Sequence, residues 1–111
     1  MEAKFELKKT RNGCYFFNLK IGSGEIILTS EMYQQKRNAE LDILSLKTLA
    51  RDDRRYERKT TLNGSPFFVF TAGNGEIIGH SEMYSSILAM ENGIESVKRN
   101  AISAYVVHIV G

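Results

Sequence analysis

The residue types best suited to chemistry occur twice in this chain, as Ser-Glu-Met-Tyr at 30–33 and again at 81–84. A carboxylate close to a phenol can bind a polar ligand or a cationic peptide, and an enzyme acting at the same place is a further possibility. The same residues also have a structural interpretation, because serine and glutamate can cap a helix start while methionine and tyrosine anchor a helix on a sheet. The candidate residues of this ligand or partner surface are Ser30, Glu31, Tyr33, Ser81, Glu82 and Tyr84.

Aromatic residues on predicted strands suggest a second kind of site. Nucleobases stack on aromatic rings that lie on an open sheet face, and neighbouring basic side chains can hold the phosphates. Of two adjacent phenylalanines on a strand, one faces the core and the other faces away, so a solvent-facing ring is expected from each pair. The candidate face for single-stranded nucleic acid consists of Phe16, Lys20 and Phe67.

The charge distribution permits such a face without requiring it. The formal net charge is +2, with nine basic and six acidic side chains in residues 1–51 and six basic and seven acidic ones in residues 52–111. Nucleic-acid-binding domains usually carry a clearer basic stripe. A binding or interaction module with an unknown partner is therefore the first functional hypothesis, and single-stranded nucleic acid is the alternative.

Other reactive residues do not combine into a recognisable site. The Gly-x-Gly-Glu motifs at 22–25 and 73–76 lead into predicted strands, whereas phosphate-binding glycine loops lead into helices, so we interpret them as hairpin turns. Cys14, His80 and His108 are neither duplicated nor closely spaced, which disfavours a metal site. We predict no catalytic residue, no metal and no cofactor, and hence a non-enzymatic protein.

The bulk composition is that of a small globular domain. The chain has 111 residues, 42% hydrophobic and 25% charged, and no run approaches the ~20 apolar residues of a membrane span. The first six residues lack the pattern of a signal peptide, and a single cysteine fits a reducing compartment. We therefore expect a cytoplasmic protein without membrane association.

The elements that position these residues come from a tandem repeat. Residues 56–101 align without a gap on residues 5–50, and 21 of the 46 paired positions are identical. A unit of about 50 residues is too small to bury a core alone, so the two copies are expected to share one. We predict a monomer with an internal pseudo-twofold and one domain over residues 1–111. It comprises repeat one at about 3–51, repeat two at about 54–102, and a C-terminal strand at about 104–110.

Each repeat is predicted to form three strands followed by a helix. Alternating apolar residues and Asn-Gly or Gly-x-Gly turns indicate strands at 3–9, 14–20 and 25–29, and at 56–61, 67–71 and 76–80. Pro66 is expected to start its strand, and Ser86 to cap the second helix. Gly93 lies inside that helix, which predicts a close packing contact there. The predicted helical stripes are Ala39, Ile43, Leu46 and Ala50, widened by Leu44 and Leu49, and Ile87, Met90, Ile94, Val97 and Ala101.

The β-branched residues at 104–110 predict a last strand that pairs back onto repeat one. The fold class is therefore α+β. Two β(3)-α-β repeats form a single antiparallel sheet with exchanged C-terminal strands, and both helices pack on one face. An apolar last strand needs a covered position, because an exposed apolar edge promotes aggregation.

The duplicated Asn-Gly, Phe-Phe, Gly-x-Gly-Glu-Ile-Ile and Ser-Glu-Met-Tyr motifs, and the helix ending at 93–101, resemble the YegP-like family of small bacterial proteins. The resemblance covers nearly the whole chain. It implies a β(3)-α-β unit, duplicated or dimeric, in one sheet with exchanged last strands. The family has no assigned function, so it implies no activity, cofactor or site residue. The chain departs from the family pattern at Asp42, at Gln35 and in the apolar tail at 105–111.

Overall fold

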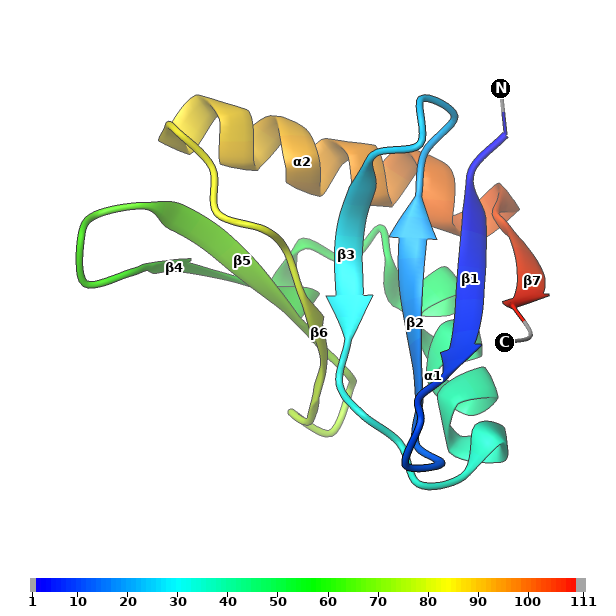
Figure 1. The fold of residues 1–111 in the computed structure, drawn as a ribbon. Coiled ribbons are helices and arrows are strands. Elements are labelled where there is room, and N and C mark those ends of the chain that lie inside the picture. Colours follow the sequence, from blue (N-terminus) through cyan, green and yellow to red (C-terminus); the bar gives the residue numbers. More distant parts are fainter. Residues whose placement is uncertain (1, 110–111) are drawn as a thin grey trace.

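The computed structural model describes residues 2–109 as seven strands in one sheet with two long helices (Figure 1). The strand order is β4-β5-β6-β3-β2-β1-β7, so each repeat forms a three-stranded meander and the two meanders meet at β3 and β6. The strands are β1 (Lys4–Lys9), β2 (Tyr15–Lys20), β3 (Ile26–Ser30), β4 (Tyr56–Thr60), β5 (Pro66–Thr71), β6 (Ile77–His80) and β7 (Tyr105–Ile109). The helices are α1 (Lys36–Leu49) and α2 (Ile87–Asn100), and short 3-10 turns η1 (Asp53–Arg55) and η2 (Ala101–Ser103) follow them.

The hairpin turns form where the glycine motifs predict them. Gly13 and Gly64 have φ near +90°, a conformation that glycine adopts without a Cβ clash. Pro66 is the first residue of β5, as predicted, and pairs with Thr60. The two repeats therefore enter their second strands through equivalent turns.

The meanders join through a short antiparallel pairing of β3 with β6. Thr29 lies opposite His80, and Ser30 lies opposite Gly79. A Cβ on Gly79 would lie 2.6 Å from the Thr29 carbonyl oxygen, so this strand position requires glycine for close approach. Leu28 occupies the equivalent position in repeat one and is buried in the core, so the junction is not symmetric.

Both helices bury the apolar stripes that their sequences predict, with two exceptions. Met90, Ile94 and Val97 of α2 are buried, and the Ser86 hydroxyl accepts a hydrogen bond from the Ala89 N–H as the predicted N-cap. The prediction was wrong for Ile87, the first residue of α2, which is 68% exposed. Leu44 of α1 is likewise exposed, on the side of the helix that faces solvent. The stripe Ala39, Ile43, Leu46 and Ala50 is buried as predicted.

The last strand returns to repeat one, as predicted, but its direction differs from the expected antiparallel pairing. β7 pairs with β1 in parallel, with Lys4 opposite Tyr105 and Lys8 opposite Ile109, so the sheet is mixed. Parallel neighbours need a crossover connection, and α2 supplies it by carrying the chain back to the start of β1 (Figure 1). Lys47 of α1 donates a hydrogen bond to the Ala104 carbonyl and fixes the start of β7. Val110, included in the predicted strand, lies outside the described residues.

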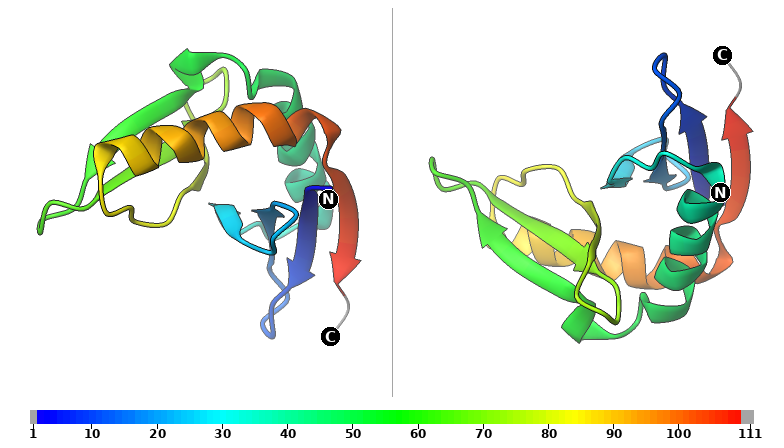
Figure 2. Two further views of the ribbon diagram at one scale, coloured as in Figure 1. Left: turned by 90° about the horizontal axis from the view of Figure 1, so that it is seen from above. Right: turned by 90° about the horizontal axis from the view of Figure 1, so that it is seen from below.

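The helices lie on one side of the sheet, as predicted. In Figure 1 α1 lies behind β1 and β2, and the opposite face of these strands is uncovered. Figure 2 shows that the β4–β5 ribbon turns away from β1–β3, so the sheet is strongly bent. No helix within residues 2–109 is long and apolar enough to cross a membrane.

Candidate functional site

The two serines of the Ser-Glu-Met-Tyr corners are structural. Ser30 and Ser81 are buried, at 4% and 1% exposure. The Oγ of Ser30 accepts a hydrogen bond from the Phe17 N–H at 2.8 Å and donates one to the Glu31 carbonyl at 2.7 Å. Ser81 makes the equivalent pair with Phe68 and Glu82. Each hydroxyl thus satisfies two backbone groups where the third strand of a repeat ends, and neither is available to a ligand.

The two tyrosines stack on core phenylalanines in the same way but differ at their hydroxyl groups. Tyr33 stacks on Phe17 at 6.2 Å, and its hydroxyl donates a hydrogen bond to Asp42 Oδ2 at 2.6 Å. Burial, together with the nearby Asp42 carboxylate, raises the pKa of Tyr33 far above its ordinary value. Stacking by both tyrosines supports the structural interpretation of the motif. It fixes the start of each helix against the sheet.

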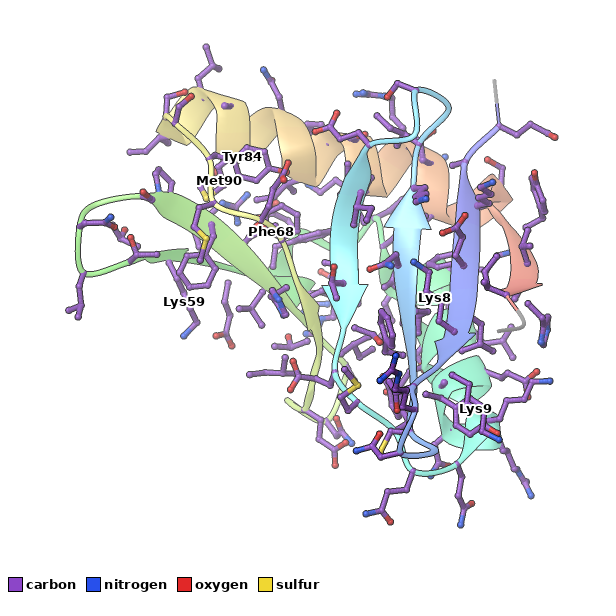
Figure 3. All side chains as sticks on the ribbon, in the orientation of Figure 1. Lys8, Lys9, Lys59, Phe68, Tyr84 and Met90 are labelled. Carbon is purple, nitrogen blue, oxygen red and sulfur yellow. The ribbon has the colours of Figure 1, made fainter. Side chains whose placement is uncertain are left out.

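In repeat two the position of Asp42 is taken by Gly93, and Tyr84 lies directly against that glycine. Tyr84 stacks on Phe68 at 6.3 Å, between β5 and α2 (Figure 3). Its hydroxyl oxygen is buried and has no hydrogen-bond partner within the described part of the chain. Burial, and then the charges of Glu82 and Glu25, raise the pKa of Tyr84 to about 12, so the phenol is neutral at physiological pH.

A groove of about 440 Å³ opens beside Tyr84. Its lining includes Glu82 from the same corner, Glu25 and Ile21 from repeat one, and Asn92 and Arg99 from α2. The groove therefore joins the two repeats and brings a phenol, an amide and charges of both signs together. Sequence reasoning selected Glu82 and Tyr84 but not the α2 residues, because nothing in the duplicated motifs points to them.

The remaining corner residue of repeat one, Glu31, faces solvent. Its carboxylate lies 3.8 Å from His80 Nδ1 on the neighbouring strand, and both side chains are half exposed. The two corners are therefore not equivalent, although their sequences are identical. Among residues 2–109, no three His, Cys, Asp or Glu side chains gather in a way that could hold a metal ion.

The uncovered face of repeat one carries a charge cluster around Glu6. This side chain is almost fully buried, and Lys4, Lys8 and Lys20 place their ammonium groups 3.5, 3.6 and 3.1 Å from its carboxylate. Burial alone would raise the pKa of Glu6, but hydrogen bonding to Lys20 and the surrounding ammonium charges outweigh it, and the pKa is lowered. Three partly exposed cations thus surround one ionised carboxylate, which leaves a net positive surface.

An aromatic ring lies at the edge of this cluster. Phe16 lies opposite Lys8 on the neighbouring strand, and the Lys8 ammonium is 5.8 Å from the ring centroid. The ring is half-buried, so part of its surface is accessible. The sheet register places Lys20 four residues further along β2, on the same face.

The third candidate of the predicted nucleic-acid face, Phe67, lies apart from the other two. It is half-buried and pairs with Lys59, the counterpart of Lys8. Two strands, β3 and β6, separate its strand from that of Phe16. Three strand spacings correspond to about 14 Å. Figure 3 shows Lys8 and Lys59 in opposite halves of the molecule.

The cluster around Glu6 was not selected from the sequence, although a signal for it existed. Lys4, Glu6 and Lys8 alternate with apolar residues and so share the polar face of β1. Lys20 joins them only through the pairing of β1 with β2, in which Lys4 lies opposite Lys20. That register had to be known before the charges could be brought together.

The comparisons with known proteins agree with this fold. Residues 11–57 and 62–107 each match the family described as "Domain of unknown function (DUF1508)". The chain is 46% identical over 102 residues to the UPF0339 protein YegP of Yersinia pestis, a match that covers 92% of this chain and 91% of that protein. The solution NMR structure of YegP from Escherichia coli superposes with a TM-score of 0.94 at 43% identity, covering 100% of this chain and 96% of that one.

A second solution NMR structure, of the UPF0339 protein SO3888 from Shewanella oneidensis, gives a TM-score of 0.92 at 41% identity, covering 97% and 92% of the two chains. The chain therefore belongs to the DUF1508 family and contains two copies of its domain. This confirms the YegP-like resemblance. These relatives are described as proteins of unknown function, so they assign no activity to any residue.

Proposed function

We propose that this protein is a non-enzymatic binding module, and that it binds single-stranded nucleic acid on the uncovered sheet face of repeat one. The observation that carries the proposal is that Lys4, Lys8 and Lys20 share one sheet face with the partly accessible ring of Phe16, which lies beside Lys8. Ammonium groups hold phosphates, and an aromatic face stacks a base without regard to sequence. An uncovered sheet with helices behind it presents both on one rigid surface.

The charge cluster suits an anionic partner for an electrostatic reason. The carboxylate of the buried Glu6 lies among the three ammonium groups, whereas the lysine side chains stay 25 to 37% exposed. The surface is therefore positive toward solvent although it contains a carboxylate. A nucleic acid whose phosphates contact two or three of these lysines should bind about tenfold more weakly at 200 mM than at 50 mM salt.

The internal duplication offers a matched control for this proposal. Lys59, Glu57 and Phe67 repeat the arrangement of Lys8, Glu6 and Phe16 on the other half of the sheet. The second copy has no counterpart of Lys20, because Thr71 occupies that position, and its glutamate is exposed rather than buried. The proposal therefore assigns binding to repeat one and little or none to repeat two.

The experiment measures the affinity of short single-stranded DNA and RNA by fluorescence anisotropy at low salt. Lys8→Gln and Phe16→Ala should each weaken binding several-fold, whereas the matched variants Lys59→Gln and Phe67→Ala should leave it within twofold. Amide spectra of each variant establish that it is folded. No binding of either polymer at low salt contradicts the proposal, and equal losses from both sets of variants contradict the assignment to repeat one.

A second candidate function is favoured by the groove at Tyr84. Its volume and mixed polarity suit a small polar molecule, and Glu82 with Tyr84 would then be ligand-binding or catalytic groups. Amide NMR spectra recorded with pools of amino acids and other small metabolites test this. Shifts confined to Tyr84, Asn92 and Arg99 would support a ligand site, and turnover lost in Glu82→Gln would make the protein an enzyme. Unchanged spectra would exclude the compounds tried.

A further inference from the structure

A second basic feature lies next to the uncovered face, where the ends of β1 and β7 meet the start of α1. A pocket of about 330 Å³ opens there. Lys8 and Lys9 come from β1, Lys36 is the first residue of α1, and His108 comes from β7. Figure 3 shows Lys9 at the end of β1, beside α1. Four nitrogen-bearing side chains from three elements therefore line one pocket.

Among the described residues, two of the pocket's three lysines have no carboxylate partner. Within residues 2–109, no Asp or Glu oxygen lies within 4.0 Å of the Lys9 or Lys36 ammonium group, and Lys8 shares Glu6 with two other lysines. The Lys9 ammonium lies 5.8 Å from the centroid of the Tyr15 ring, which holds it at the pocket wall. Like charges gathered without counterions repel one another, so an anion placed between them is stabilised.

The residue types that line the pocket are not repeated in repeat two, which argues against a purely structural origin. The counterparts of Lys9, Tyr15 and Lys36 are Thr60, Pro66 and Ile87. The fold therefore forms at this position without any of the three. The strand that closes the pocket, β7, is also found only beside repeat one.

We propose that this pocket binds a terminal phosphate of the single-stranded nucleic acid, that is, a phosphomonoester. The rest of the nucleic acid lies on the uncovered sheet face. A phosphomonoester carries about −1.5 to −2 charges at pH 7, against −1 for an internal diester, so it gains more from three lysines. Lys8 lines the pocket and also lies over Phe16, which makes the two surfaces continuous. The inference rests on the proposed function, since it names the part of the nucleic acid that the pocket recognises.

The test compares three hexathymidylates of one sequence, with a 5′-phosphate, a 3′-phosphate or hydroxyl groups at both ends. The phosphorylated oligomer of the correct polarity should bind about tenfold more tightly than the unphosphorylated one, which corresponds to one charge-assisted contact of about 1.4 kcal/mol. The double variant Lys9→Gln/Lys36→Gln should abolish this difference while it retains the affinity for the unphosphorylated oligomer.

A charge-matched control separates the pocket from a general loss of positive charge. Lys59→Gln/Arg51→Gln also removes two cations, and both residues lie outside the pocket. This control should keep the tenfold preference. All four substituted side chains are exposed, so each variant should fold with little change in stability.

The outcomes distinguish this inference from the proposed function. Equal affinity for all three oligomers, or a preference that survives in Lys9→Gln/Lys36→Gln, overturns the phosphate site and leaves the nucleic-acid face intact. If no oligomer binds, the proposed function fails. Titration with inorganic phosphate then tests whether the pocket binds an anion on its own. Saturable amide shifts of Lys9, Lys36 and His108 would support an anion site, and unchanged signals would contradict it.

Discussion

The hydroxyl end of the Tyr84 ring lies directly against Gly93, whereas its counterpart in repeat one, Tyr33, donates a hydrogen bond to the carboxylate of Asp42. Asp42 and Gly93 occupy the same position in the two repeats. This one difference gives the Tyr33 hydroxyl of repeat one a hydrogen-bond partner. In repeat two the Tyr84 hydroxyl is buried without a partner among the described residues, beside an open groove. The two serines and the stacking of the two tyrosine rings are alike in both copies.

Replacing Gly93 by alanine should destabilise the protein. The new Cβ would lie 2.7 Å from Cζ of Tyr84, so the ring must move away from Phe68. Overpacking costs about 1–3 kcal/mol, and the higher helix propensity of alanine offsets up to about 1 kcal/mol. Urea unfolding should show a net loss of about 1–2 kcal/mol. Gly73→Ala, where no atom lies within 4 Å of the new Cβ, is the control. A Gly93→Ala protein as stable as the parent would contradict the packing described.

Removal of the two corner hydroxyls should have unequal effects. Tyr33→Phe deprives the Asp42 carboxylate of a 2.6 Å hydrogen bond, whereas Tyr84→Phe removes a hydroxyl without a partner in the described chain. We expect Tyr33→Phe to cost about 1 kcal/mol more than Tyr84→Phe. Denaturant midpoints of the two variants, measured side by side, give this difference. Equal costs would show that the two hydroxyls are equally well satisfied.

The buried serines should be among the most sensitive polar positions. Ser30→Ala leaves the Phe17 N–H and the Glu31 carbonyl without their shared partner, and Ser81→Ala does the same in repeat two. A buried backbone group without a partner costs about 1–3 kcal/mol. Thermal unfolding should show a clear drop for each, and almost none for the exposed control Ser85→Ala. Functional residues at the surface would give the opposite pattern, a change in binding without a change in stability.

Acid stability should depend on Asp53. Its carboxylate accepts hydrogen bonds from Arg58 and Lys98, which lower its pKa from 3.8 to about 2. Because the folded-state pKa is depressed, this stabilisation is complete above pH 3.8 and is lost as the pH falls toward 2. Asp53→Asn should therefore be less stable than the parent at pH 5, and the gap should narrow as the pH falls through 2. Glu40→Gln, outside this network, is the control. A gap that stays constant with pH would contradict the ion pairing.

The repeat made much of this fold predictable from the sequence. The alternating strands, the Asn-Gly turns, Pro66 at the start of β5 and the contact at Gly93 all depend on local pattern, and the structure confirms them. The parallel direction of β7 was not predictable, because strand polarity depends on where α2 ends. The exposure of Ile87, at the first position of α2, could not be predicted from the helical period either.

The candidate sites were only partly accessible to sequence reasoning. The Ser-Glu-Met-Tyr motif drew attention to its serines, which are buried, and away from Asn92 and Arg99 of the groove. The basic surfaces depend on strand register and on the return of β7, which bring together Lys20 with Glu6 and Lys9 with His108. Residues so far apart in the chain carry no common local signal.

The most direct test of the central claim is a two-dimensional amide NMR titration of labelled protein with short single-stranded DNA and RNA at low salt. The account predicts saturable shifts at Lys8, Phe16 and Lys20 that added salt reverses, with much smaller changes around Phe67. An unchanged spectrum at low salt, or shifts confined to the groove at Tyr84, would contradict a nucleic-acid face and favour a protein partner or a small ligand.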